Sequence, residues 1–386
     1  MAGSYAQSMR CVPSLTVHVE RPRKATNNRG RGYCVKTPTA RERIAGCLLG
    51  GAIGDALGAP IEFDSLEQIR ARFGPAGLTT YAPAYGRIGA ITDDTQMTLF
   101  TAEGLIRANA RSVDRGIVNV AWIVSRAYCR WLVTQDGPDI QDADLGSAVS
   151  GWLITNDVLH ARRAPGTTCL GALSSGRWGT PQQPLNDSKG CGGVMRVAPV
   201  GLIATGGRAF DLGADLAAIT HGHPTGYLAA GAFAVIVGEV MAGSDLVDAV
   251  AAARTELVGH PGSEETVAAL DAAVELAARG EPSPEEIESL GGAWVAEEAL
   301  AIGVCCALVA RDPRHGLLLA VNHGGDADST GSIAGNLLGT IHGRNGLPAD
   351  LLDTLEARDI IEQVGRDLAD AFVDGKMLPY QRYPAY

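Results

Sequence analysis

Apolar residues recur with helical spacing in one segment of this chain after another. The spacing predicts helices over residues 39–59, 94–110, 116–134, 142–160, 208–220, 225–242, 245–258, 264–279, 284–310, 329–343 and 348–373. Thr39 stands where a helix N-cap is expected, so we expect ordered structure to begin there. Between Arg162 and about Gly193 the periodicity is lost among Pro, Gly and Ser, and a loop this long inside a domain is usually functional or disordered.

The composition also favours helices. The chain has 386 residues, is rich in Ala and Gly, and contains 5% aromatic residues, whereas β-rich chains depend on aromatic and β-branched side chains. A hydrophobic fraction of 46% is ample for a buried core. We therefore expect a compact, all-α body, and the length fits either one large domain or two.

Two of the expected helices carry a glycine at every fourth position. These residues are Gly46, Gly50, Gly54 and Gly58 in the first helix, and Gly331, Gly335, Gly339 and Gly343 near the C-terminus. Residues four apart lie on one face of a helix, and glycine there costs roughly 1 kcal/mol each relative to alanine. Close backbone packing explains that cost, so we expect the two helices to meet in the core. The spacing resembles the small-residue pattern of membrane helices, but these segments are too short and too polar to span a bilayer.

Charge separates the beginning of the chain from its body. The net charge is −11, yet residues 1–38 hold seven basic residues and one acidic residue, so they carry +6 and the remainder −17. Residues 1–38 have no usable periodicity, and we expect a flexible basic extension that only weakly resembles a transit peptide. We expect a single domain over residues 39–375 and an extended tail on the surface over residues 376–386.

The bulk properties argue against several classes of protein. An acidic body does not suit stable nucleic-acid binding, which needs clustered Lys and Arg. No apolar run approaches the roughly 20 residues that cross a bilayer, and no secretion signal is evident. The eight cysteines form no CxxC pair, and we expect reduced thiols in a cytoplasmic protein.

Two clusters of acidic and hydroxyl side chains lie more than two hundred residues apart. The first is Thr92-Asp93-Asp94-Thr95, and the second is Asp326-Ala327-Asp328-Ser329-Thr330. Each cluster alone is explained by helix capping, since Asp and Thr satisfy the free N–H groups of a first turn. Together they indicate a site for hard cations such as Mg²⁺ or Mn²⁺, which prefer oxygen ligands. Packed carboxylates are tolerable only with bound metal, because like charges otherwise force protonation.

Other reactive side chains favour structural explanations. His221 and His223 are two apart and such a pair can bind metal, although a histidine satisfied in the core or in a loop is the more common case. His323 precedes the second acidic cluster and has no assigned role. Cys191 lacks an evident general base, which argues against a nucleophile. We expect residues 162–170 to line a cleft because of their loop character.

Several segments of the chain resemble the ADP-ribosylglycohydrolases, the family of dinitrogenase-reductase-activating glycohydrolase and the ADP-ribosyl-acceptor hydrolases. In order, they are GDALGAPIE at 54–62, TDDTQ at 92–96, SKGCGGVMRVAP at 188–199, THGHP at 220–224 and GGDADSTG at 324–331. The resemblance spans roughly residues 41–345 and implies an all-α orthogonal bundle with two divalent cations, Mg²⁺ or Mn²⁺. By motif match the metal ligands are Thr92, Asp93, Asp94, Asp326, Asp328 and Ser329. The family often has Thr at the last of these positions, and Ser still offers a hydroxyl oxygen.

The resemblance also implies an ADP-ribose site on a glycine-rich loop. Its expected contacts are Ser188, Gly190, Cys191, Gly192, Gly193, Met195, Arg196 and His221. Glycines let backbone N–H groups approach phosphate oxygens, and Arg196 can add charge, although an arginine beside such a loop is more often structural. The family often has Asn at the position of Cys191 and Ala at that of Gly193, which concerns the detailed substrate preference.

The implied reaction is hydrolysis of the glycosidic bond between ADP-ribose and a side chain. Asp94 and Asp328 are the candidate general bases, and Glu62 is a candidate acid, base or gating residue. The first expected substrate is ADP-ribosyl-arginine on a protein, with ADP-ribosyl-serine, an ADP-ribosylated nucleobase or a small conjugate as alternatives. A non-catalytic ADP-ribose-binding protein and an unrelated metal phosphohydrolase stay open. We expect a monomer that binds neither nucleic acid nor membranes.

Overall fold

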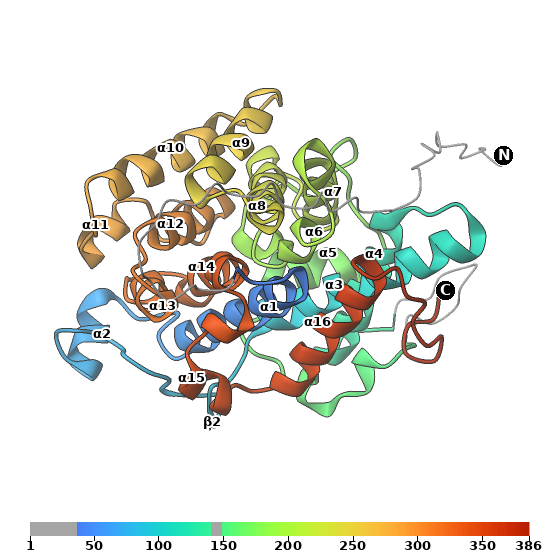
Figure 1. Cartoon of the computed structure of the whole chain (residues 1–386), viewed down its shortest axis with the longest axis horizontal. Coiled ribbons are helices and arrows are strands. Elements are labelled where there is room, and N and C mark those ends of the chain that lie inside the picture. Colours follow the sequence, from blue (N-terminus) through green and yellow to red (C-terminus); the bar gives the residue numbers. More distant parts are fainter. Residues whose placement is uncertain (1–36, 140–148, 386) are drawn as a thin grey trace, which may run out of the picture.

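Sixteen α-helices make up most of residues 37–139 and 149–385, which the computed structural model describes (Figure 1). In chain order they are α1 (Ala40–Gly58), α2 (Leu66–Phe73), α3 (Asp93–Arg115), α4 (Val120–Thr134), α5 (Thr167–Ser174), α6 (Ala198–Gly201), α7 (Gly206–Ala218), α8 (Pro224–Ala242), α9 (Leu246–Val258), α10 (Glu264–Ala278), α11 (Pro284–Glu288), α12 (Ala296–Leu308), α13 (Pro313–Val321), α14 (Ala327–His342), α15 (Ala349–Thr354) and α16 (Arg358–Phe372). An antiparallel pair, β1 (Pro83–Ala84) and β2 (Arg87–Ile88), forms the one small sheet in these ranges. The expected all-α class is therefore confirmed. The extension expected over residues 1–38 lies almost wholly outside the described residues.

The two glycine-striped helices, α1 and α14, pack directly against each other near the centre of the molecule (Figure 1). A Cβ atom added at Gly54 would overlap the backbone of Gly331, and similar overlaps recur one turn away at Gly50 and Gly58. The expected meeting of the two helices is confirmed, and close backbone contact offsets the low helix propensity of glycine. Because Gly58 abuts the backbone of Asp328, the stripe brings the C-terminal end of α1 to the N-terminal end of α14.

Helix α8 is long and apolar enough to cross a membrane by length and composition, but 78% of that stretch is buried inside the protein. Its main neighbours are α7, α9 and α6. A helix that is hydrophobic all round is expected where other helices surround it, so its place in the core accounts for its sequence.

Two segments expected as single long helices are each divided in the structure. The segment expected over residues 284–310 forms α11 and α12, because Gly291 adopts φ 122° between them, a conformation that a helix does not accommodate. The segment expected over residues 348–373 forms α15 and α16, separated by Ala357 at φ 55°. Both interruptions supply chain segments that reach the site described below.

Short elements also differ from expectation. Part of the helix expected over residues 142–160 lies outside the described residues, and residues 149–160 contain two 3₁₀ turns in place of an α-helix. Helix α5 lies within the stretch expected to be a loop. Helices α2, α6 and α13 had no counterpart among the predictions, because each spans only one to three turns and carries too short an apolar pattern.

The chain after α16 contains no helix or strand as far as Ala385. Tyr383 and Ala385 are nevertheless buried, and the Tyr383 hydroxyl donates to the carboxylate of Asp367 at 2.8 Å. The expectation of an extended surface tail is therefore wrong for these two residues. Burial of an aromatic side chain against α16 is worth more than leaving it in water, and the hydroxyl keeps a hydrogen-bond partner.

Candidate active site

The first acidic cluster opens α3 and is held in place by Asp55 of α1. Thr92 is the N-cap of α3, and its hydroxyl accepts from the N–H of Asp94 at 3.3 Å. The Asp55 carboxylate accepts from the N–H of Thr92 at 3.0 Å and from the N–H of Thr95 at 3.1 Å. Burial raises the pKa of Asp55 to about 6. The sequence predicted no role for Asp55, whose one signal was its place in the GDALGAPIE motif.

The second acidic cluster opens α14 beside the first. Asp326 is the N-cap of α14, and Asp328 lies in its first turn. The Thr92 hydroxyl donates to Oδ2 of Asp328 at 3.1 Å, although 236 residues separate them. Gly325, at φ 131°, lets the backbone approach Gly292, whose carbonyl accepts from the N–H of Asp326 at 3.0 Å. The expected convergence of the two remote clusters is confirmed.

Glu62, in the turn after α1, completes a group of five buried carboxylates. The other four are Asp93, Asp94, Asp326 and Asp328. Carboxylate oxygens of Glu62, Asp326 and Asp328 lie within 4.8 Å of one another. Burial, and then the charges of Asp326 and Asp93, raise the pKa of Glu62 to about 9. Burial and the neighbouring charge of Asp93 likewise raise the pKa of Asp94 well above its usual range. The negative charges of neighbouring acids therefore oppose the ionisation of Glu62 and Asp94.

These five carboxylates have no protein counter-charge. Among residues 37–139 and 149–385, no Lys, Arg or His forms an ion pair with any of them. Oε2 of Glu62 and Oδ2 of Asp94 are buried oxygens without a hydrogen-bond partner in that part of the chain. A buried carboxylate is costly unless it is paired or coordinates a metal. The donor set, all oxygen and mostly anionic, therefore fits hard divalent cations.

The remaining predicted ligands lie in the same buried region. Oδ2 of Asp93 accepts from the N–H of Gly166 at 3.3 Å. The hydroxyl of Ser329 lies 3.7 Å from Sγ of Cys191 and 4.0 Å from Sδ of Met195. The structure thus gathers all six residues that motif matching named, and their assignment as metal ligands stays a prediction.

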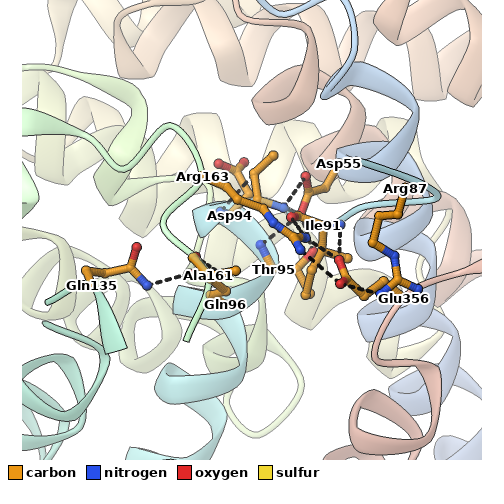
Figure 2. Close-up of polar contacts among 11 residues, drawn as sticks. Asp55, Arg87, Ile91, Asp94, Thr95, Gln96, Gln135, Ala161, Arg163 and Glu356 are labelled. Atoms are coloured by element: carbon orange, nitrogen blue, oxygen red, sulfur yellow. Dashed lines mark hydrogen bonds and ion pairs between the residues drawn. The ribbon is translucent and has the colours of Figure 1, made fainter. Parts of the chain in front are cut away.

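A separate network fixes the backbone just before the first cluster (Figure 2). The Glu356 carboxylate accepts from the N–H of Ile91 at 3.0 Å and from the Arg163 guanidinium. Arg87 forms an ion pair with the same carboxylate at 2.7 Å, and Arg163 also donates to the Ile91 carbonyl at 2.8 Å. Because Ile91 precedes Thr92, these contacts set where α3 begins.

The loop at residues 161–166 forms a wall beside the acids. Gln96 of α3 donates to the carbonyl of Ala161 at 2.9 Å and accepts from Gln135 at 3.0 Å (Figure 2). At the other end of the loop, Gly166 contacts Asp93. The segment expected to line a cleft therefore lies against the first acidic cluster.

The glycine-rich loop reaches the acids through Cys191. Its thiol donates to Oδ2 of Asp326 at 2.8 Å, and burial raises the pKa of the thiol well above its usual range. A protonated thiol is a poor nucleophile, in agreement with the expectation. The Ser188 hydroxyl accepts from the N–H of Gly190 at 3.3 Å, and Gly193 packs under the loop against α7.

His221 and Arg196 lie beneath the glycine-rich loop. Burial and then the charge of Arg196 lower the pKa of His221 to about 3, so its ring is neutral. Gly192 leaves room for that ring, since a Cβ atom there would come within 3.1 Å of it. Arg196 is fully buried and donates to the carbonyl of Leu216 at 3.2 Å and to Thr220 at 2.7 Å. Its guanidinium therefore supports the loop from inside, as the structural alternative expected.

His223 and His323 both have structural partners. His223 is the N-cap of α8 and accepts from the N–H of Thr225 at 3.1 Å. His323 is buried, with Nε2 3.0 Å from the hydroxyl of Thr330. The structural explanations favoured for both residues fit these contacts.

Fold and site together define an all-helical protein with a buried acidic centre next to a glycine-rich loop. The family model for ADP-ribosylglycohydrolase matches residues 36–377, and the chain belongs to that family. The resemblance inferred from the sequence motifs is thereby confirmed.

Characterised relatives and a solved structure extend this comparison. The chain is 28% identical to the ADP-ribosyl-[dinitrogen reductase] glycohydrolase of Rhodospirillum rubrum over 87% of this chain and 99% of the relative. It is 24% identical to the ADP-ribosylarginine hydrolase Tri1 of Pseudomonas putida GB-1, over 87% of this chain and 81% of the relative. A solved chain described as an ADP-ribosylglycohydrolase-related protein complex aligns with TM-score 0.59 and 24% identity, covering 85% of this chain and 97% of that one, which shows a shared fold.

Proposed function

We propose that this protein is a metal-dependent hydrolase that cleaves the glycosidic bond between ADP-ribose and an arginine side chain of a modified protein. Family membership supports hydrolysis of an ADP-ribosyl bond. The names of two relatives, one acting on ADP-ribosylated dinitrogen reductase and one on ADP-ribosylarginine, support arginine as the acceptor.

The observation that carries the proposal is the group of five buried carboxylates without a counter-charge in the described part of the chain. Two cations, Mg²⁺ or Mn²⁺, would be held by the set Thr92, Asp93, Asp94, Asp326, Asp328 and Ser329. When bound, such ions polarise substrate oxygens and lower the pKa of a bound water. Oδ2 of Asp94 accepts no hydrogen bond from the described residues, which leaves it open to a cation, and Oε2 of Glu62 beside this set is likewise unpartnered there.

The hydrogen bonds favour some carboxylates over others as the general base. Oδ2 of Asp328 accepts from Thr92, and Oδ1 accepts from the N–H of Ser329 at 2.9 Å, so both of its oxygens are engaged. Asp94 and Glu62 each keep one oxygen that accepts no hydrogen bond from residues 37–139 or 149–385. We therefore prefer Asp94 or Glu62 for accepting the proton of the attacking water, with Asp328 as an orienting group. The remaining negative charge of the group favours an oxocarbenium-like transition state.

The glycine-rich loop is the proposed site for the ADP-ribose moiety. Gly192 lets the loop backbone lie directly against the ring of His221, which is neutral, and a glycine backbone can approach phosphate oxygens closely. A neutral ring can donate one hydrogen bond to ribose or phosphate without adding charge. The loop would thus bind and orient the leaving ADP-ribose, and Arg196 would hold the loop in shape.

The test is release of free ADP-ribose from an ADP-ribosyl-arginine protein in Mg²⁺ or Mn²⁺, followed by chromatography. We expect release with the wild-type chain, and loss of release in Asp93→Ala, in Asp328→Ala and after chelation. Asp271→Ala is a matched control, because the Asp271 side chain is 41% exposed and its ion pair among the described residues is with Arg254 on the surface. Release of phosphate or AMP, or tight ADP-ribose binding without turnover, would contradict the proposal.

A further inference from the structure

Two exposed aromatic rings stack on each other at the edge of the acidic group. Phe63 is 71% exposed and Trp294 is 47% exposed, although aromatic side chains of this size are usually covered. Their ring centroids are 5.7 Å apart and their planes differ by 16°. Because neither ring is buried in the core, the pair offers a ready surface for a ligand.

Both residues of the pair are linked to the site through the backbone, Phe63 by sequence and Trp294 by a hydrogen bond. Phe63 follows Glu62 in the turn after α1. Trp294 lies in the segment between α11 and α12, and its carbonyl accepts from the N–H of Cys191 at 3.3 Å. Two residues earlier, the Gly292 carbonyl accepts from the N–H of Asp326. The stacked pair, here called the aromatic platform, therefore borders the acids from two different chain segments.

The geometry of the aromatic platform restricts how a ligand can use it. Stacked planar groups sit about 3.5–4 Å apart, so a third plane between the rings would need about twice that separation. The observed 5.7 Å leaves no room for one. A planar ligand must lie on the outer face of the pair, where indole presents the stronger site for a cation.

The charge of the site indicates what kind of planar group that is. The buried carboxylates beside the aromatic platform make its neighbourhood acidic, so a cationic group suits the platform better than an anionic one. No basic side chain of the described residues pairs with those carboxylates. A guanidinium is planar, cationic and weakly hydrated, and it stacks on aromatic faces better than an ammonium or a neutral group.

We propose that the aromatic platform of Phe63 and Trp294 binds the guanidinium of the modified arginine and so selects arginine as the acceptor. The inference rests on the proposed function for its substrate, but it assigns a separate task to residues outside the acids and the glycine-rich loop. Trp294 supplies the stacking face, and Phe63 holds the indole in place from behind.

A binding experiment tests the platform without catalysis. Agmatine, which carries a guanidinium, and N-carbamoylputrescine, in which a neutral urea replaces it, are titrated into the Mg²⁺-loaded protein while the heat of binding is recorded by isothermal titration calorimetry. We expect agmatine to bind in preference to the urea, Trp294→Ala to weaken agmatine by roughly tenfold, and Trp294→Phe to retain most of the binding. Equal binding of agmatine by wild type and Trp294→Ala would overturn the inference.

A kinetic experiment then connects the platform to specificity. Trp294→Ala and Phe63→Ala should lower the ratio of kcat/KM for ADP-ribosyl-arginine over ADP-ribosyl-serine about tenfold, mainly through KM, with the Trp294 variant the more affected. The affinity for free ADP-ribose should not change, because that product lacks the acceptor. Tyr380→Ala removes a ring of similar exposure, 49%, from the C-terminal segment and serves as the control.

The outcomes separate the two proposals. A wild-type protein that releases no ADP-ribose from any conjugate contradicts the proposed function. The agmatine titration still tests whether the aromatic platform binds a guanidinium. An active wild type whose variants lose both substrates equally overturns the platform alone. A loss of ADP-ribose affinity in Trp294→Ala would assign the ring to adenine and would also overturn it.

Discussion

Two kinds of buried acidic side chain lie within this fold, and they differ in what neutralises them. Glu356 is 2% exposed and is met by Arg163 and Arg87. Glu103 is fully buried and forms ion pairs with Arg130 at 2.9 Å and with Arg107, one turn further along the same helix, at 3.4 Å. The five carboxylates of the candidate active site are equally buried, yet they have no such partner in the described part of the chain.

The difference separates structural from functional acids. Paired acids satisfy their oxygens with protein donors, so the folded chain needs nothing further from solution. The unpaired group is stable only when its carboxylates take up protons or cations, which makes its charge dependent on what is bound. Substituting one acid of each kind should therefore change activity and stability in opposite ways.

The largest effect is expected from an unpaired acid. Asp94→Asn should lower kcat for ADP-ribosyl-arginine hydrolysis on the order of 10³-fold or more, because it removes an anionic oxygen that has no structural partner. The same change should raise the thermal midpoint of the chelated protein, since it relieves repulsion from Asp93. Kinetics and differential scanning fluorimetry in EDTA measure the two effects. A destabilised chelated variant would show that Asp94 is a structural acid after all.

Substitution of Glu356, a paired acid, should instead destabilise the protein. Glu356→Ala leaves the buried guanidinium of Arg163 without its partner, and we expect the free energy of unfolding to fall by about 3–5 kcal/mol with or without metal. Urea unfolding measures the loss. Asp271→Ala, which breaks the exposed pair with Arg254, should cost no more than about 1 kcal/mol. A loss for Glu356→Ala as small as that of the control would mean that the network does not hold the start of α3.

The contrast also explains which parts of the site were predictable from the sequence. The acids of the two clusters lie in short runs at helix starts, so their spacing alone indicated a shared site, and the glycine stripes of α1 and α14 indicated what brings them together. Glu356 and Arg163 are single residues 193 positions apart, and an isolated acid has no local pattern. Moreover, Glu356 fell inside a segment predicted as one helix, and the break at Ala357 that turns it inward depends on tertiary contacts.

The helices themselves were predicted best where the apolar pattern was long. The boundaries of α1, α8 and α9 agree with the expected ranges to within one residue, because each has a clear cap and a long apolar sequence. The prediction of a single helix over residues 284–310 was wrong for a different reason. Periodicity continued across Gly291 and Gly292, although the backbone there turns away and carries Trp294 to the edge of the site.

A further effect is expected from pH, and it distinguishes the metal-free from the metal-bound protein. Glu62 has a pKa of about 9 in the folded chain and about 4.5 when unfolded, so the folded chain binds more protons between these values. The metal-free protein should therefore be most stable below pH 4.5 as far as Glu62 is concerned, and lose that stability as the pH rises towards 9. Chemical unfolding at a series of pH values in EDTA measures this slope.

Metal should flatten the same profile. At a concentration 100 times its Kd, Mg²⁺ is expected to add about 2.7 kcal/mol to the free energy of unfolding, and the gain should be larger at higher pH, where the carboxylates need neutralising. Glu62→Gln should reduce the slope in EDTA. Identical slopes with and without Mg²⁺ would indicate that the cation does not meet these carboxylates.

The smallest effect is expected from Cys191, which contacts the unpaired acids but carries no charge. Its thiol donates to Oδ2 of Asp326, so Cys191, like Thr92 and Gly166, gives the acidic group a hydrogen bond without a counter-charge. Serine can make the same donation from a similar position, and we expect Cys191→Ser to keep kcat within about threefold of wild type, since a neutral hydrogen bond contributes only about 1 kcal/mol. A nucleophilic thiol would behave differently, because its removal would abolish covalent chemistry. Steady-state kinetics beside the Asp94→Asn protein decides the matter: a comparable loss in both variants would make Cys191 a reacting group and would require a different mechanism.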